Sequence, residues 1–149
     1  MRLTREVDYA LRIMRCLAEN PTANNGVSAT VISETIHVPI RFTQKILRKL
    51  SGSDMVHSYK GAGGGYSLTR PSSQITLLEV VEAVDGPMAI SPCLCADFEC
   101  THSGDQIEQC FYHRVFCEVN RKIAEMLSKI TLDAAAEDRC CEITNLLNQ

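Results

Sequence analysis

Residues 28–70 constrain the fold more than any other part of the chain. They contain two short amphipathic segments joined by the turn His37-Val38-Pro39, then two strand-like runs separated by glycines. Ser28 suits the start of the first helix, and Pro39 suits the start of the second. Residues 61–65 fit a hairpin tip between strands over 55–60 and 65–69. Two helices joined by a tight turn and followed by a hairpin predict a winged helix-turn-helix.

Helical spacing also fixes which side chains should face the core. In the first helix of this motif the inward positions are predicted to be Val31, Ile32 and Ile36. In the second helix they are predicted to be Phe42, Ile46, Leu47 and Leu50. The polar positions of that second helix would then face solvent or a ligand.

Further helices are expected on both sides of this motif. Residues 3–19 repeat apolar groups at i, i+3, i+4 and i+7, with Thr4 as a suitable N-terminal start. That apolar face consists of Val7, Ala10, Leu11, Met14, Leu17 and Ala18. A helix is expected over 78–84 and a long one over about 107–130. The long helix carries a continuous apolar stripe, which either packs on its own domain or covers a second copy.

The predicted fold class is therefore mainly α with a small β-hairpin wing: a winged helix-turn-helix plus a long C-terminal dimerisation helix. We divide the chain into a DNA-binding domain (1–86), a cysteine loop (87–106), and a dimerisation helix with its tail (107–149). The tail carries Cys140 and Cys141, whose spacing indicates no site. Its residues from 134 onward are expected to form a short helix.

Charge and hydropathy restrict the partners. Residues 1–73 hold ten Lys/Arg and five Asp/Glu, whereas residues 74–149 hold five and thirteen. A basic first half suggests contact with a polyanion. No apolar run is long enough for a membrane span, and the charged N-terminus lacks a signal-peptide core. We expect a cytoplasmic protein with no membrane partner, whose thiols stay reduced.

The second helix of the motif and the wing provide the candidate DNA contacts. Gln44 is the first candidate for a base edge, because its amide can pair bidentately with adenine. Arg41 and Thr43 come next, while the basic residues suit phosphates. The predicted DNA-binding set is Ser28, Arg41, Thr43, Gln44, Lys45, Arg48, Lys49, Lys60, Gly61 and Gly64. A merely solvated helix face is the alternative for any one of them.

The wing sequence also resembles that of a known family. Residues 58–68 read SYKGAGGGYSL, similar to the signature S-x-R-G-x-x-G-G-Y-x-L of the IscR/NsrR-type winged-helix regulators, which include iron–sulfur biogenesis regulators and nitric-oxide-sensitive repressors. Residues 1–4, 8–11, 44–50, 75–77 and 85–86 are similar to the same family, so the resemblance covers residues 1–130. Lys60 stands where arginine is usual; it keeps the charge but lacks the planar guanidinium.

This resemblance implies a homodimeric transcription regulator, a repressor in some members, that binds double-stranded DNA at a partly palindromic operator. It implies that three cysteines before the dimer helix hold an iron–sulfur cluster, 2Fe–2S or 4Fe–4S, through which the protein senses cluster status, redox state or nitric oxide. No nucleophile–base motif and no phosphate loop in a βαβ setting is present, so we do not expect an enzyme.

The cysteines fit the family's ligand pattern with one departure. Five of the eight cysteines lie in residues 93–117. Cys93-x6-Cys100 matches the first interval and Cys110-x2-His113 matches the end, but Cys100-x9-Cys110 is about four residues longer than usual. Cys95 is a rival for Cys93. The resemblance leaves the fourth ligand open between His113 and Asp8, the latter donated across the dimer.

Other roles for the cysteines remain open. Zinc is an alternative, although the paired C-x2-C spacing of structural zinc is missing. A cluster-free family member that responds by thiol chemistry, or to a bound effector or partner, is the second function we consider. Cys16 is expected to be a packing residue, and Cys117 to be core or a spare thiol.

Overall fold

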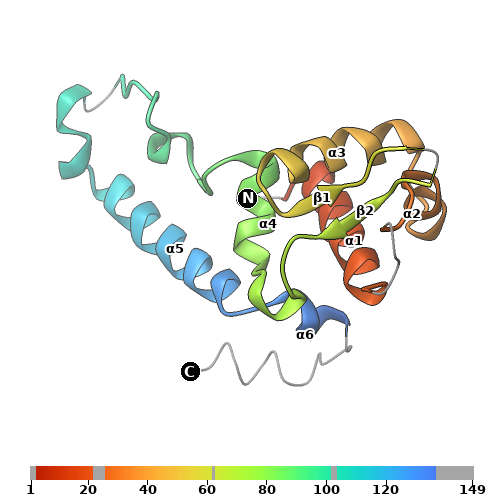
Figure 1. Cartoon of the computed structure of the whole chain (residues 1–149). Coiled ribbons are helices and arrows are strands. Elements are labelled where there is room, and N and C mark those ends of the chain that lie inside the picture. The colour runs from red at the N-terminus through yellow and green to blue at the C-terminus, as the bar shows by residue number, and fades with distance from the viewer. Residues whose placement is uncertain (1–2, 22–25, 62, 102–103, 137–149) are drawn as a thin grey trace.

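The structure is a computed structural model, and it describes residues 3–21, 26–61, 63–101 and 104–136. Its elements follow one another along the chain as shown in Figure 1. They are α1 (Arg5–Glu19), α2 (Ala29–Thr35), α3 (Ile40–Gly52), β1 (Val56–Ser58), β2 (Tyr66–Leu68), α4 (Leu77–Asp85), α5 (Phe111–Ser128) and α6 (Leu132–Ala136), with 3-10 turns at Ser72–Gln74, Pro92–Leu94 and Gly104–Gln109. The part of the predicted tail beyond residue 136, with Cys140 and Cys141, lies outside the described residues.

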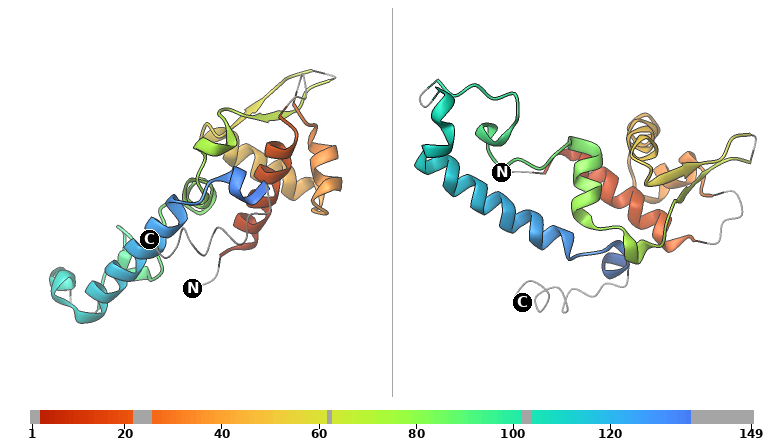
Figure 2. Two further views of the ribbon diagram at one scale, coloured as in Figure 1. Left: turned by 90° about the horizontal axis from the view of Figure 1, so that it is seen from below. Right: turned by 60° about the vertical axis from the view of Figure 1, so that its left-hand side comes forward.

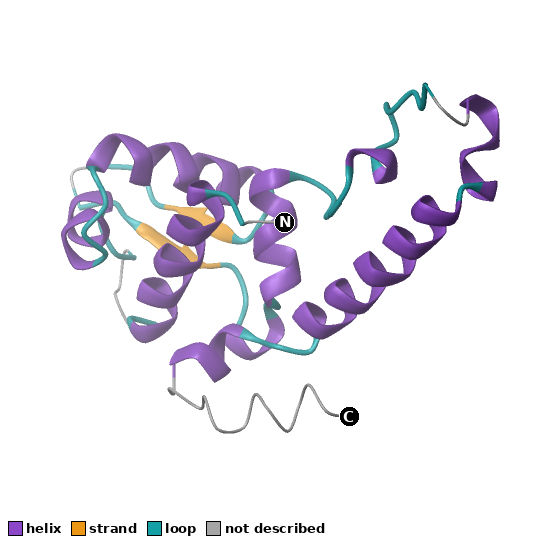
Figure 3. Ribbon diagram, turned by 180° about the vertical axis from the view of Figure 1, so that it is seen from behind, coloured by secondary structure: helices purple, strands orange, loops and turns teal. Residues whose placement is uncertain are grey.

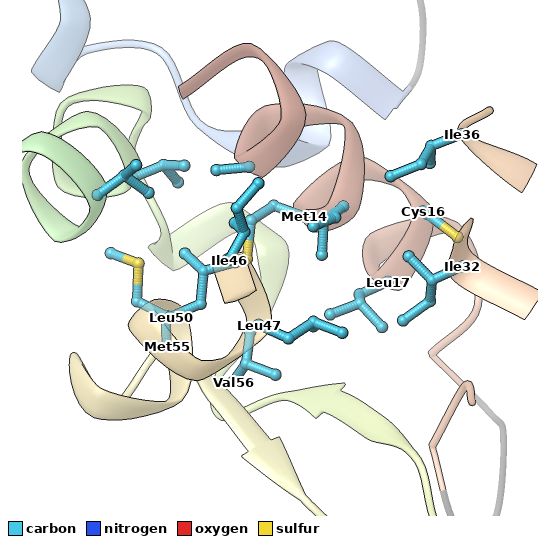
Figure 4. Packing of buried hydrophobic residues seen from close by; sticks show 14 of the residues in the cluster. Met14, Cys16, Leu17, Ile32, Ile36, Ile46, Leu47, Leu50, Met55 and Val56 are labelled. Carbon is cyan, nitrogen blue, oxygen red and sulfur yellow. The ribbon is translucent and has the colours of Figure 1, made fainter. Parts of the chain in front are cut away.

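Helix α1 is the centre of the core and packs against α3, α4 and α6. Thr4 caps it as predicted, accepting a hydrogen bond from the backbone of Val7 at 3.3 Å. The buried face includes Ile13, which the sequence prediction omitted, whereas Leu11 and Ala18 lie at its edge. Cys16 is buried as predicted, beside the other apolar side chains in Figure 4, and burial raises the pKa of its thiol.

The helix-turn-helix is confirmed, but two inward positions were wrong. Ser28 caps α2 by accepting from the backbone of Val31, and His37 turns the chain with φ 54°. Val31 and Phe42 are about half exposed, and Thr43 is fully buried. The stripe Thr43, Ile46, Leu47, Leu50 keeps exact i, i+3, i+4, i+7 spacing. Thr43 can take a core position because its hydroxyl donates to the carbonyl of Val38 at 3.3 Å.

The wing is an antiparallel hairpin in which Val56 pairs with Leu68 and Ser58 with Tyr66. Val27 adds a bridge beside β2, exchanging backbone hydrogen bonds with Tyr66 at 2.8 and 2.9 Å. Gly26, which precedes it, has φ 74°, and a Cβ there would lie 2.6 Å from the Tyr66 backbone. The segment before α2 therefore anchors the base of the wing to the helix-turn-helix.

Helix α4 begins with a complete capping box between Thr76 and Glu79. Hydrogen bonds from Thr76 and Arg70 lower the pKa of Glu79 although its partial burial opposes this. The chain returns to this point after α5: Leu77 N donates to Ile130 O at 2.8 Å, and Leu132 N donates to the carbonyl of Ile75 at 3.0 Å. Leu132 is 1% exposed, so α6 packs into the winged-helix core rather than extending the arm of α5.

Helix α5 projects from this core, and the cysteine loop runs out beside it (Figures 1 and 3). It begins at Phe111, later than predicted, because residues 104–109 form 3-10 turns and Cys110 is the N-cap. None of its residues is buried. Figure 2 shows the wing and the cysteine loop at opposite ends of the molecule. Within the described residues, no helix has the length and apolar character needed to span a membrane.

Candidate DNA-binding surface and cysteine site

Helix α3 presents a polar face to solvent. Arg41, Gln44 and Arg48 are exposed, and their spacing of three and four residues places them along one side of the helix. Within the described part of the chain none of the three joins an ion pair or a side-chain hydrogen bond. The buried stripe on the opposite side fixes their direction, so these side chains are free to meet an external polyanion.

The two lysines of α3 are engaged within the protein. Lys45 and Lys49 bind the carboxylate of Glu6 on α1, at 2.5 and 2.7 Å. Lys49 also donates to the carbonyl of Val84, near the end of α4, at 2.8 Å. Hydrogen bonds from Lys45 and then Lys49 hold the pKa of Glu6 below its usual value. These contacts tie α3 to α1 and α4, so the two lysines fix the helix as well as carrying charge.

Two other members of the predicted DNA-binding set have structural roles. Thr43 has no exposed surface, so it cannot reach a base edge from this position; we remove it from the set. Ser28 uses its hydroxyl to cap α2. Phe42 was expected in the core, but its aromatic ring is about half exposed, next to Arg41. The unbroken spacing from Thr43 to Leu50 was the signal that would have placed Phe42 outside.

The wing carries its candidate contacts at the far end of the hairpin. Lys60 is exposed. Gly61 has φ 111°, a value that side chains disfavour, and a Cβ on Gly64 would lie 2.2 Å from the carbonyl oxygen of Tyr59. The two glycines are thus required by the backbone path, and they leave Lys60 at a narrow tip.

The cysteine loop holds reduced thiols of differing exposure. Cys93 lies in the turn Pro92–Leu94, is half-buried, and has its sulfur 3.2 Å from the Ser91 hydroxyl. Cys95 is exposed, whereas Cys100 and the N-cap Cys110 are half-buried. All four are reduced cysteines. The described residues contain no preassembled group of three or more metal-binding side chains.

The two candidates for the fourth ligand lie in different parts of the molecule. His113 is one turn into α5, close to Cys110 in the chain, and its Nε2 is 3.4 Å from the sulfur of Cys117. Its Nδ1 is buried and has no hydrogen-bond partner in the structure. Asp8 lies on α1, where it forms an ion pair with Arg12 at 2.9 Å.

This donor set fits an iron–sulfur cluster chemically. Thiolates are the usual ligands of such clusters, and imidazole nitrogen replaces thiolate in some of them. Three half-buried, reduced thiols and a buried ring nitrogen without a hydrogen-bond partner supply both donor types.

A helix-turn-helix with a basic exposed helix, a hairpin wing and a projecting helix defines a winged helix-turn-helix transcription regulator. The family model "Rrf2: Iron-dependent Transcriptional regulator" matches residues 3–138. The chain therefore belongs to the Rrf2 family of transcriptional regulators. This confirms the resemblance read from the wing and the expectation that the protein is not an enzyme.

Individual relatives agree with this assignment. The chain is 36% identical over 133 residues to the HTH-type transcriptional regulator ORF2 of Azotobacter vinelandii, covering 89% of this chain and 77% of the relative. It is 31% identical over 132 residues to the HTH-type transcriptional regulator IscR of Sodalis glossinidius, covering 89% and 76%. CymR, the global cysteine regulator of B. subtilis, shares the fold with a TM-score of 0.68 at 22% identity, covering 92% and 97%.

Proposed function

We propose that this regulator senses iron–sulfur cluster status, redox state or nitric oxide through a cluster held by Cys93, Cys100 and Cys110. The carrying observation is the presence of three reduced, half-buried thiols, one of which, Cys110, is the N-cap of the helix whose first turn holds the buried, unbonded Nδ1 of His113. The likeness to an IscR and the iron-dependent description of the family support it. When bound, the cluster would supply an iron that reacts with oxygen, nitric oxide or a reductant.

DNA would be bound mainly by α3 and the wing. Gln44 would read a base edge, while Arg41, Arg48 and Lys60 would contact phosphates or a groove. Phe42 adds an exposed apolar group beside them that could meet a thymine methyl. Lys45 and Lys49 would contribute positive potential while holding α3 to the core.

The operator would be bound by a homodimer formed through α5. Large apolar side chains of this helix are exposed on one side, and they recur with helical spacing. They are Phe111, Tyr112, Val115, Phe116, Val119 and Met126. An apolar stripe of this kind on a helix that projects from its own core suits an isologous interface, in which a second copy covers it.

A sensing site at one end of the molecule must affect DNA contacts at the other. The cysteine loop follows directly on the end of α4, where Asp85 accepts hydrogen bonds from Thr4 at 2.9 and 3.0 Å. The neighbouring Val84 carbonyl accepts from Lys49 of α3. A shift of the loop would therefore change the support of α1 and α3 together, and through them operator affinity.

The decisive experiment is an anaerobic spectrum with iron and sulfide analysis. Purified or reconstituted protein should be brown and contain both elements. Single Ala replacements of Cys93, Cys100 and Cys110 should each lose iron, whereas Cys95→Ala should keep it as the matched control. A colourless wild-type protein without iron after reconstitution would refute the cluster, and a variant that retains iron removes its cysteine from the ligand set.

Thiol chemistry without a cluster is the second candidate function. It is supported by the contact between Cys117 and His113 at 3.4 Å, and by the shared fold with a regulator described as a global cysteine regulator. In that case iron-free protein should change its operator affinity on treatment with peroxide or a disulfide, and Cys117→Ala should abolish the change. Iron-free wild type that binds DNA equally well before and after oxidation would refute it.

A further inference from the structure

Asn120 lies in the middle of α5 and binds the backbone at the start of the cysteine loop through both ends of its amide. Its Oδ1 accepts from the N–H of Ile90 at 3.1 Å, and its Nδ2 donates to the carbonyl of Met88 at 3.0 Å. The two contacts span 30 and 32 positions of the chain. A single side chain thus satisfies a donor and an acceptor of a segment that has no regular secondary structure to satisfy them.

The side of α5 that carries Asn120 faces the chain's own loop. The half-buried residues of this helix are His113, Asn120, Ile123, Ala124 and Leu127, while the large apolar residues are more exposed. His113 and Asn120 are seven residues apart, which is about two helical turns, so they share this face. Ile123 and Leu127 extend the face and line a cavity together with Met88 and Cys95.

The backbone of Met88 also forms a hydrogen bond to α4, on the side of the segment opposite α5. Its backbone N–H donates to the Glu82 carboxylate of α4 at 3.3 Å. The segment from Met88 to Ile90 is therefore held between α4 and α5, three residues before Cys93. A thiol that follows so soon after a double backbone anchor has little freedom to move away from α5.

We propose that Asn120 is the positioning residue that holds the start of the cysteine loop against α5 and so brings Cys93 to the helix face that carries His113. It touches neither a thiol nor DNA, and it acts through the backbone of Met88 and Ile90. Its link to cluster binding rests on the function proposed above. Its control of the position of Cys93 does not, and iron-free protein can test it.

The variants are chosen to separate positioning from folding. Asn120→Ala removes both hydrogen bonds, and alanine is a better helix former than asparagine, so α5 itself is not weakened. Asn120→Asp keeps the acceptor for Ile90 but places a second acceptor oxygen against the Met88 carbonyl. Lys122→Ala is the matched control, because Lys122 is exposed two residues further along α5, on about the opposite side of the helix, and its ion pair within the described residues is with Glu118.

Two measurements on iron-free, reduced protein test the proposal. In Asn120→Ala, amide hydrogen exchange at Ile90 and alkylation of Cys93, resolved by mass spectrometry, should both accelerate about tenfold, as expected for the loss of one to two net hydrogen bonds. Asn120→Asp should accelerate both less, and Lys122→Ala neither. Unchanged exchange at Ile90 would overturn the anchor; faster exchange with unchanged alkylation would overturn the positioning of Cys93.

A third measurement connects the anchor to the cluster. Reconstituted Asn120→Ala should lose its visible absorption about tenfold faster than wild type under an iron chelator, again from the loss of one to two hydrogen bonds. An equal lifetime would overturn the link to the site. If wild-type protein takes up no cluster, the proposed function fails, while exchange and alkylation still decide the role of Asn120.

Discussion

The winged-helix core buries its apolar side chains, whereas the arm exposes them. The arm consists of the cysteine loop and α5. The core encloses a continuous cluster contributed by α1, α2, α3, α4 and α6. Helix α5 is the longest in the described chain, yet it buries no residue. The core therefore buries its apolar side chains within the chain, whereas α5 leaves its large apolar side chains exposed. This difference separates mutations that unfold the protein from mutations that alter its assembly and sensing.

The largest expected effect is in the core. Leu47→Ala should lower the free energy of unfolding by about 2–5 kcal/mol, because it leaves a cavity under α3. Chemical denaturation followed by circular dichroism measures it. The matched control is Met126→Ala on α5, which is partly exposed and should change the stability of the core far less. Equal losses would contradict the division between core and arm.

A charge introduced into α5 should weaken dimerisation and leave the stability of the core unchanged. Val119→Glu lies within the exposed apolar stripe and should weaken dimerisation by at least about 2 kcal/mol, because an unpaired charge would be buried in the interface. Sedimentation over a range of concentrations measures the change. Denaturation of the core should stay as in wild type. Unaltered self-association, or a monomeric wild type, would refute α5 as the interface.

Replacing the proposed DNA-contacting side chains of α3 should affect neither stability nor assembly. Gln44→Ala should weaken operator binding by about 1–3 kcal/mol through the loss of a base contact. Arg48→Ala should instead lower affinity for all sequences and reduce the salt dependence by about one ion. Fluorescence anisotropy with operator and scrambled duplexes at several salt concentrations distinguishes the two. Identical loss on both duplexes for Gln44→Ala would mean that Gln44 reads no base.

The smallest effect concerns the ion pairs that join α1 to α3. Because the pKa of Glu6 is lowered in the folded protein, its stabilisation is present above the unfolded value of about 4.3 and is lost as pH falls through the folded pKa. Glu6→Gln should cost at most about 1 kcal/mol at pH 7, since the pair is partly exposed. Once the pH lies below the folded pKa, so that the carboxyl is protonated in both the folded and the unfolded state, wild type and Glu6→Gln should unfold at similar denaturant concentrations. If the stability difference between wild type and Glu6→Gln grew as the pH fell, the pKa of Glu6 would be raised in the folded protein rather than lowered.

The core was largely predictable because its signals are local. Thr4, Ser28 and the spacing of Ile46, Leu47 and Leu50 indicate helix starts and buried faces over a few residues. The exception is instructive: Phe42 looked like a core residue by hydrophobicity, but Thr43 has the correct phase and can satisfy its hydroxyl within one turn. A pattern based on residue type alone places the larger apolar group inside.

The arm was predictable only in outline. The cysteines could be recognised from the sequence, but their exposure and neighbours could not, because the loop has no periodicity to fix its path. The amide of Asn120 gave no signal, since its partners are backbone groups 30 and 32 residues away. The engagement of Lys45 and Lys49 with Glu6 was hidden for the same reason, because α1 and α3 are separated by about 40 residues.

The sequence by itself determined the winged helix-turn-helix, its family and the candidate thiols, because caps, turns and apolar spacing act between neighbouring residues. Only the tertiary structure decided which residues of α3 face outward, that α6 returns to the core, and how the cysteine loop is held. These outcomes depend on contacts between distant segments. Hydrophobic burial decides between such contacts, and no local sequence pattern reveals the outcome. The hydrogen bonds of Asn120 likewise form only after α5 and the cysteine loop have packed together.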